Sequence, residues 1–190
     1  MALKIGVIVS TTRPSRVGRG IADWFLEQVK DIPQIEFELL DLAEINLPLV
    51  DEPKSAMMGQ YQNEHTKKWS QTIAPLDGYV WVTAEYNHGY PAPLKNAIDT
   101  LYHEWSRKPV AFVGYGGLGA ARAIEQLVQV AAQVNMVAIP STTVQVIDVW
   151  SALDENGAPK PEFVRGDSKK MLEQLTWWAN ALKIAREQSV

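Results

Sequence analysis

The stretch GYVWVTAEYNHGYPAPLKNAIDTLYHEW, residues 78–105, decides the fold. It opens with GYVWVTA, an apolar and β-rich segment that predicts a strand. Further on, apolar residues recur at helical spacing and predict a helix through Leu94, Ala97, Ile98, Leu101, Tyr102 and Trp105. The loop between them holds Tyr, Asn, His, Gly and Pro, residue types that fill a core poorly. We therefore expect a strand, an ordered polar loop at its end and a helix, which together form the repeating unit of an α/β fold.

The same alternation of strand and helix runs through the rest of the chain. Strands are expected at 3–9, 35–42, 78–84 and 109–116, with a fifth strand region shared by 135–140 and 142–150. Helices are expected near 21–29, 69–73, 94–105, 123–131 and 168–187. This pattern predicts a flavodoxin-like, doubly wound, five-stranded parallel sheet of order 2-1-3-4-5 with helices on both faces. The segment 35–42 alternates apolar and acidic residues, as expected of a half-exposed edge strand, and residues 1–190 are expected to form a single domain.

Composition excludes several classes of function. The chain has no cysteine, which excludes disulfides, thiol catalysis and thiolate metal sites and fits a reducing, cytoplasmic location. A net charge of −4 argues against nucleic acid as a partner. No apolar run approaches the length of a membrane span, and the N-terminus lacks the features of a signal peptide, so no membrane association is expected.

The histidines and carboxylates do not suggest a metal or hydrolytic site. His65, His88 and His103 lack metal-ligand spacing, and His103 lies at a position typical of a structural residue. No G-x-S-x-G motif is present for a serine hydrolase. Lys95 and Asp99 are spaced for an ion pair along one helix. We expect no metal and no catalytic side chain.

The loop STTRPSRVGRG, residues 10–20, follows the first strand and opens the first helix. A helix N-terminus offers unpaired N–H groups and a partial positive charge, and hydroxyl and guanidinium groups can complete an anion site. Such groups here are Ser10, Thr11, Thr12, Arg13, Ser15, Arg16 and Arg19. The loop is not a G-x-x-x-x-G-K-[ST] cradle, so an NTPase is not indicated. The loop predicts phosphate binding, the alternative being a solvated basic helix cap.

A second loop, GYGGLGAARA at 114–123, matches G-x-G-x-x-G. We do not interpret it as a dinucleotide fingerprint, because it belongs to the fourth strand–helix unit. The acidic residue expected about 20 positions on is also missing, since Asp148 lies farther away. The glycines would let a ligand approach the backbone closely. Tight packing of a helix against its strand is the alternative.

The third loop can hold a flat heterocycle. Tyr86, Asn87, His88 and Tyr90 can supply a wall and polar edges, and Gly89, Pro91 and Pro93 fix the path of the chain. With STTRPSRVG and GYGGLGAARA, the segment EYNHGYPAPLKNAIDTLYHEW resembles the NADPH-dependent FMN reductase family, most closely its flavodoxin-like NAD(P)H:quinone reductase members. The similarity runs in order through nearly the whole chain.

The resemblance implies one non-covalent FMN in this domain, with NADPH or NADH as co-substrate. The phosphate would be surrounded by Thr11, Arg13, Ser15, Arg16, Val17 and Gly18. The isoalloxazine would be lined by Glu85, Tyr86 and Asn87, while contact by His88 in the same loop is left open. Gly116 and Gly117 would meet the pyrimidine edge. The family also implies a homodimer with the flavin near the interface, and pairing into tetramers is left open.

Our hypothesis is an FMN-dependent NAD(P)H oxidoreductase. It would pass a hydride through flavin N5 to a quinone or similar flat acceptor, with donor and acceptor using one site in ping-pong order. The first alternative is a flavodoxin-type electron carrier, which the basic phosphate loop and the mild net charge of −4 disfavour. The second is a flavin-dependent redox sensor that docks a protein partner.

Overall fold

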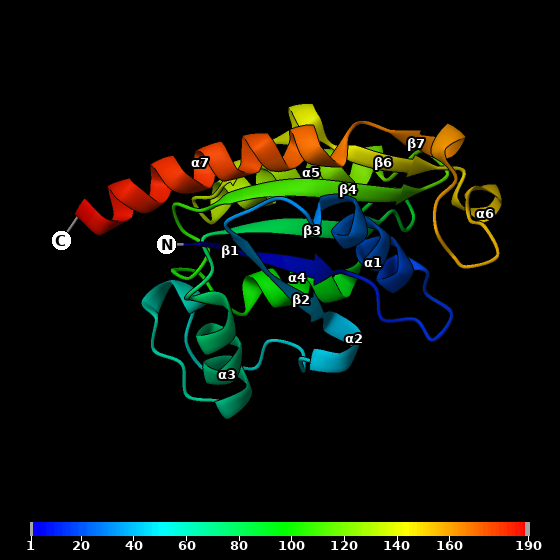
Figure 1. The fold of residues 1–190 in the computed structure, drawn as a ribbon. Coiled ribbons are helices and arrows are strands. Elements are labelled where there is room, and N and C mark those ends of the chain that lie inside the picture. Colours follow the sequence, from blue (N-terminus) through cyan, green and yellow to red (C-terminus); the bar gives the residue numbers. More distant parts are fainter. Residues whose placement is uncertain (1, 189–190) are drawn as a thin grey trace.

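One sheet runs through the middle of the computed structural model, which describes residues 2–188 (Figure 1). Its strands are β1 (Leu3–Val9), β2 (Ile35–Asp41), β3 (Gly78–Ala84), β4 (Pro109–Gly116), β5 (Val137–Ala138), β6 (Val144–Ile147) and β7 (Val164–Arg165). The strand order is β2-β1-β3-β4-β6-β7, and β5 pairs with β4. The strands pair in parallel, except that β7 is antiparallel to β6. The predicted doubly wound, flavodoxin-like order is confirmed.

The predicted number of strands is wrong, because the sheet has seven strands and not five. The expected fifth strand is split into β5 and β6, which both pair with β4. A 3₁₀ turn over Pro140–Thr142 separates them, and proline cannot donate a hydrogen bond to a ladder. The last strand, β7, lies in residues 154–167, DENGAPKPEFVRGD, a segment rich in turn-forming residues. Strands of two residues are too short to show a periodic pattern.

Five helices match the predicted ones: α1 (Gly18–Val29), α3 (Glu64–Ile73), α4 (Ala92–Asp99), α5 (Ala121–Gln133) and α7 (Ser168–Gln188). The short helices α2 (Leu42–Ile45) and α6 (Val149–Ala152) were not predicted. No helix within residues 2–188 has the length and apolar character needed to cross a membrane.

The helix predicted to reach Trp105 ends instead at Asp99. Leu101 and Trp105 lie beyond its end and are nevertheless fully buried. The indole Nε1 of Trp105 donates to the carbonyl oxygen of Ile98 at 3.1 Å, so the chain turns back onto the helix. The apolar spacing beyond Asp99 therefore reflects burial in a turn. The predicted pair of Lys95 and Asp99 is confirmed as an ion pair along α4.

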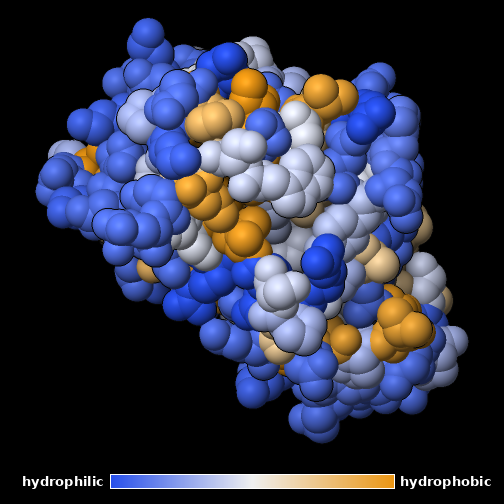
Figure 2. Space-filling view, turned by 90° about the vertical axis from the view of Figure 1, so that its right-hand side faces the viewer, coloured by the Kyte–Doolittle hydropathy of each residue, from blue (hydrophilic) through white to orange (hydrophobic). Residues whose placement is uncertain are grey.

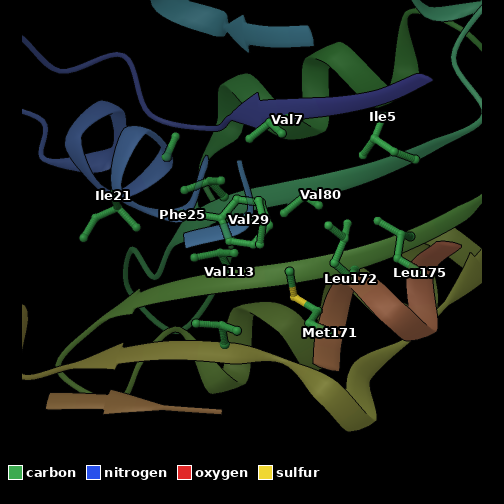
Figure 3. Packing of buried hydrophobic residues seen from close by; sticks show 14 of the residues in the cluster. Ile5, Val7, Ile21, Phe25, Val29, Val80, Val113, Met171, Leu172 and Leu175 are labelled. Atoms are coloured by element: carbon green, nitrogen blue, oxygen red, sulfur yellow. The ribbon is translucent and has the colours of Figure 1, made fainter. Parts of the chain in front are cut away.

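Helices cover both faces of the sheet because alternate strand residues point to opposite sides. In β3, Val80 and Val82 face α1 and α7, whereas Tyr79 and Trp81 face α3, α4 and α5. Figure 3 shows α1 and α7 contributing Phe25 and Met171, among others, to the first of these layers.

Three tryptophans of the helices pack in or against the core. Trp69 is buried, and its Nε1 donates to the carbonyl oxygen of Ala97 at 2.9 Å. Trp24 and Trp178 are partly buried against the layer formed with α1 and α7. The edge strand β2 is half exposed along its first residues, as predicted, and pairs with β1.

The register of the sheet brings the strand ends together at one edge. Val9 of β1 pairs with Val82 near the end of β3, Ala84 pairs with Tyr115, and Gly116 pairs with Ile147. The parallel strands point toward the side on which α6 lies (Figure 1). The loops that follow β1, β3, β4 and β6 therefore lie at one end of the sheet, where ligands bind in doubly wound folds.

Candidate functional site

A pocket of about 410 Å³ opens at the carboxyl ends of the strands. Figure 2 views this side of the molecule, where hydrophobic and near-neutral residues gather between strongly hydrophilic ones. The pocket is lined by eight of the residues predicted for the site: Arg13, Ser15, Arg16, Val17, Glu85, Tyr86, Gly116 and Gly117. The three loops singled out from the sequence therefore contribute to one cavity.

Two arginines reach the pocket from the same loop with different partners. Arg16 donates to the carboxylate of Asp41 at 2.7 Å, and their side chains are 19% and 1% exposed, respectively. Arg13 is exposed, and its guanidinium carbon lies 6.0 Å from the centre of the Tyr86 ring. Its NH2 group also approaches Ser15 Oγ at 3.5 Å. Asp41 thus fixes Arg16, whereas Arg13 remains at the surface, where it can meet an anion.

Thr11 and Gly18 lie beneath the pocket and do not line it. Thr11 Oγ1 and the Tyr115 hydroxyl form a buried hydrogen bond of 2.9 Å. A Cβ atom on Gly18 would come within 2.4 Å of that hydroxyl, so only glycine fits without displacing it. Burial raises the pKa of Tyr115, which keeps its phenol neutral. These residues support the floor of the pocket.

The loop after β3 forms a tight hairpin over residues 86–89. Tyr86 N donates to Gly89 O at 2.8 Å, and Gly89 N donates back at 3.1 Å. Asn87 and His88 occupy the two central positions with φ angles of 50° and 74°, as in a type I′ turn. Both side chains are exposed at the tip, outside the pocket lining. The hairpin therefore leaves Tyr86 at the pocket and directs its two central residues elsewhere.

The Glu85 carboxylate is bound to the first turn of α5. It accepts hydrogen bonds from Arg122 Nε at 2.6 Å and from the Arg122 backbone N–H at 3.1 Å. Burial acts to raise the pKa of Glu85, but the bonds from Arg122 outweigh it and the pKa is lowered. The side chain is therefore an engaged anion at neutral pH. The main chain of Glu85, which lies across from Gly116, can still contact a ligand.

Two glycines of the glycine-rich loop pack closely against their neighbours, and two others line the pocket. A Cβ atom on Gly114 would lie 2.2 Å from Gly119 O, and one on Gly119 would lie 2.7 Å from Gln145 Cβ, so these two glycines permit close packing. Gly116 and Gly117 instead line the pocket. Gly116 has a φ angle of 147°, which side chains rarely allow. Part of the loop packs the helix, and part forms an open floor.

A fourth wall was missed by the sequence analysis. Val149, Trp150 and Leu153 line the pocket from α6 and the residue that follows it. The segment 142–150 was expected to be a strand, but the strand ends at Ile147, and Asp148 adopts a left-handed conformation with a φ angle of 45°. The sequence offers a signal for this helix: Asp148 interrupts the apolar run, and Val149 and Leu153 follow at helical spacing.

Two of the histidines, His65 and His103, have structural partners. His65 Nε2 lies 2.9 Å from an oxygen of Asp51, and His103 Nε2 lies 2.8 Å from Met57 O. His103 therefore binds backbone in a turn after α4, in agreement with its predicted structural role, although it is not on a helix. Within residues 2–188, no group of three or more His, Asp or Glu side chains is arranged to hold a metal ion.

Comparisons with known proteins agree with this geometry. Residues 3–150 match the sequence profile of the family described as NADPH-dependent FMN reductase. An NAD(P)H-dependent FMN reductase of Schizosaccharomyces pombe is 44% identical over 171 residues, covering 88% of this chain and 86% of the relative. A 2-hydroxy-1,4-benzoquinone reductase of Burkholderia sp is 29% identical over 91% of this chain and 92% of its own.

A solved structure of similar fold is the flavoenzyme NAD(P)H:(acceptor) oxidoreductase of Paracoccus denitrificans. Its TM-score is 0.68, its sequence identity is 23%, and the match covers 95% of each chain. At this level of identity the likeness concerns the arrangement of the sheet and helices.

Proposed function

The chain belongs to the NADPH-dependent FMN reductase family, and from this premise we propose that it passes electrons from NADPH or NADH through FMN to a quinone or similar flat acceptor. The family makes it an oxidoreductase that uses FMN and a nicotinamide nucleotide. The choice of a quinone as acceptor is supported by the benzoquinone reductase relative. The observation that carries the proposal is that one pocket has an arginine- and serine-bearing loop at one wall and glycine and aromatic residues at others.

The residues present fit FMN. Ser10 Oγ and Arg16 Nε are buried without a hydrogen-bond partner within residues 2–188, and both belong to the loop proposed to bind phosphate. Arg13 and Ser15 add a guanidinium and a hydroxyl at the surface of the pocket. Gly116 and Gly117 present backbone without side chains, which allows a flat ring to approach closely.

We assign roles to the predicted residues on this basis. Arg13, Ser15, Arg16 and Val17 would hold the phosphate, with Thr11 and Gly18 supporting the loop from below. Glu85 and Tyr86 would contact the ring from one side, and Gly116 and Gly117 would meet its pyrimidine edge. Asn87 and His88 would contact a ligand that extends to the hairpin tip.

We expect no side chain that lines the pocket to act as an acid or base. Glu85 is held as an anion by Arg122, and Tyr115 is a neutral phenol bonded to Thr11. Bound FMN itself supplies hydride transfer through its ring nitrogen N5. The protein would bind the two substrates in turn at one opening of the pocket, which gives ping-pong kinetics.

We also propose that the protein is a cytoplasmic homodimer. Leu49, Val50, Met57 and Met58 are exposed on the segment between α2 and α3, and Leu49 is 80% exposed. The start of this segment is fixed to α4, because Asn96 accepts from Val50 N at 3.0 Å and donates to Pro48 O at 2.8 Å. An ordered apolar surface of this kind fits a second copy of the chain. A sequence without cysteine fits a reducing compartment.

An anaerobic stopped-flow experiment tests the proposed function. NADPH or NADH should bleach the absorbance of the flavin-loaded protein, and 1,4-benzoquinone should restore it in a second mixing step. Steady-state rates with both substrates varied should give parallel double-reciprocal lines. Flavin that neither nucleotide bleaches would instead indicate an electron carrier, and intersecting lines would show that donor and acceptor bind together.

A further inference from the structure

Trp150 lines the pocket with an aromatic surface that does not pack in the core. Its side chain is 82% exposed, although Val149 and Leu153, from the same wall, are partly buried against the core. A Cβ atom built on Gly117 would lie 3.5 and 3.8 Å from two carbons of the indole six-membered ring. The indole therefore rests with one edge against the glycine floor and extends outward from it.

The backbone that carries Trp150 is fixed to the pocket. Asp148 N donates to Gly117 O at 3.2 Å, which ties the start of α6 to the glycine-rich loop. At its other end, Ala152 O accepts from Lys160 N at 2.8 Å, and Lys160 Nζ donates to Ser151 O at 3.1 Å. A residue held in place at both sides offers a stacking surface at little cost in ordering.

The two exposed aromatic residues of the pocket, Tyr86 and Trp150, differ in the ligands that they can accept. Tyr86 has the Arg13 guanidinium 6.0 Å from its ring centre, so a cation accompanies that side. Within residues 2–188, no Lys or Arg side chain lies over the Trp150 ring, and its neighbour on the floor is Gly117. The Trp150 side is therefore suited to a neutral, flat and apolar ligand.

We propose that Trp150 determines the choice of electron acceptor, by stacking against the outer ring of quinones with two fused rings. This inference rests on the proposed function. Gly117 lies against one edge of the indole, and the rest of the ring is exposed. The exposed remainder is available to a substrate that enters later. A naphthoquinone has a second ring that could lie against this outer surface while the first ring reacts, and a benzoquinone lacks it.

The test compares Trp150→Ala and Trp150→Phe with Trp177→Ala as a matched control. Trp177 is also exposed, at 62%, but lies on α7 and is not part of the pocket lining. The dissociation constant of 1,4-naphthoquinone is measured by calorimetry on the oxidised, flavin-loaded protein without NAD(P)H. The KM values for 1,4-naphthoquinone and 1,4-benzoquinone are measured alongside, together with the FMN content of each protein.

Trp150→Ala should weaken naphthoquinone binding about two- to tenfold, which is the range expected for loss of one aromatic contact. Trp150→Phe should recover most of the loss. Trp177→Ala should resemble the wild type in every measurement. In Trp150→Ala the KM should rise more for naphthoquinone than for benzoquinone, and the protein should still bind FMN.

Three results would overturn the inference. An unchanged naphthoquinone affinity in Trp150→Ala would show that the indole does not contact the acceptor. A loss of FMN from that variant would assign the indole to the cofactor, and a change in oligomeric state would assign it to a subunit interface. A wild-type protein that binds FMN but reduces no quinone would refute the proposed function itself, which distinguishes the two failures.

Discussion

The ion pair between Arg16 and Asp41 joins the pocket to the edge of the sheet, so the substitution Arg16→Ala should affect stability as well as ligand binding. The Asp41 carboxylate is only 1% exposed. One of its oxygens accepts from Arg16 at 2.7 Å, and the other accepts from Ala43 N at 3.0 Å. Removing Arg16 would leave this buried charge with the backbone bond and with Arg19, whose NH1 lies 3.8 Å away.

The size of the effect follows from what remains around Asp41. Breaking a buried ion pair by removing one partner costs about 3–5 kcal/mol. Arg19 and the Ala43 N–H retain part of the stabilisation, and Arg16 is itself 19% exposed. We therefore expect a loss of about 2 kcal/mol in the free energy of unfolding. For a chain of this size that corresponds to a fall in Tm of about 4–8 °C.

The assay is urea and thermal unfolding of the flavin-free protein as a double-mutant cycle of Arg16→Ala, Asp41→Asn and the double variant. Because the residues form a pair, the double variant should lose clearly less than the sum of the single losses. Arg13→Ala is the control and should leave the free energy of unfolding within about 0.5 kcal/mol of the wild type. A stable Arg16→Ala variant, or additivity within about 0.5 kcal/mol, would refute this reasoning.

Three other predictions concern stability of the flavin-free protein. Gly18→Ala should lower the free energy of unfolding by about 2 kcal/mol, because its Cβ would meet the buried Tyr115 hydroxyl. Gly20 is exposed on the same helix, and a Cβ atom there would lie 3.5 Å from its nearest neighbour, Gly157 O. Gly20→Ala should therefore be neutral or stabilising by up to about 1 kcal/mol. Equal effects of the two substitutions in urea unfolding would contradict this reasoning. Glu85→Gln should cost about 1–2 kcal/mol at pH 7. Because the folded-state pKa of Glu85 is lowered, the difference in free energy of unfolding between the wild type and Glu85→Gln should shrink as pH falls below about 4.3. Urea titrations at several pH values measure this difference, and a constant value would be inconsistent with the pairing of Glu85 and Arg122. Burial lowers the pKa of Lys108, which precedes β4, to about 7. Between pH 7 and about 10.4 the unfolded chain therefore binds a proton at Lys108 that the native protein does not, so the free energy of unfolding rises with pH. Lys108→Met should flatten this rise over pH 7–9. An unaltered slope would show that Lys108 stays charged in the folded protein.

Much of the fold could be predicted because its long elements have clear patterns. The central strands are continuous apolar runs, and four of the helices carry a distinct apolar stripe. The errors occurred where residues are buried without belonging to a helix, or where a strand is too short to have a pattern of its own. Leu101 and Trp105 continue the spacing of α4, but they are buried in a turn. The two-residue strands β5 and β7 are set by tertiary pairing with β4 and β6, which leaves no local signal.

The sequence predicted three of the four walls of the pocket. The loops after β1, β3 and β4 were recognisable because arginines, tyrosine and glycines follow strand ends directly. The contribution of Trp150 depends on Asp148 turning the chain back toward Gly117, a long-range contact that spacing does not reveal. The sequence also could not show that Thr11 lies under the pocket, because that depends on its bond to Tyr115 across the sheet.

The most direct test of the central claim, that these strand-end loops form one binding pocket for a flavin nucleotide, is a fluorescence titration of the flavin-free protein with FMN and with riboflavin. We predict one FMN bound per chain, with riboflavin at least about tenfold weaker, because it lacks the phosphate that Arg13, Ser15 and Arg16 would bind. Equal affinity for the two flavins, or no binding of either, would contradict the account.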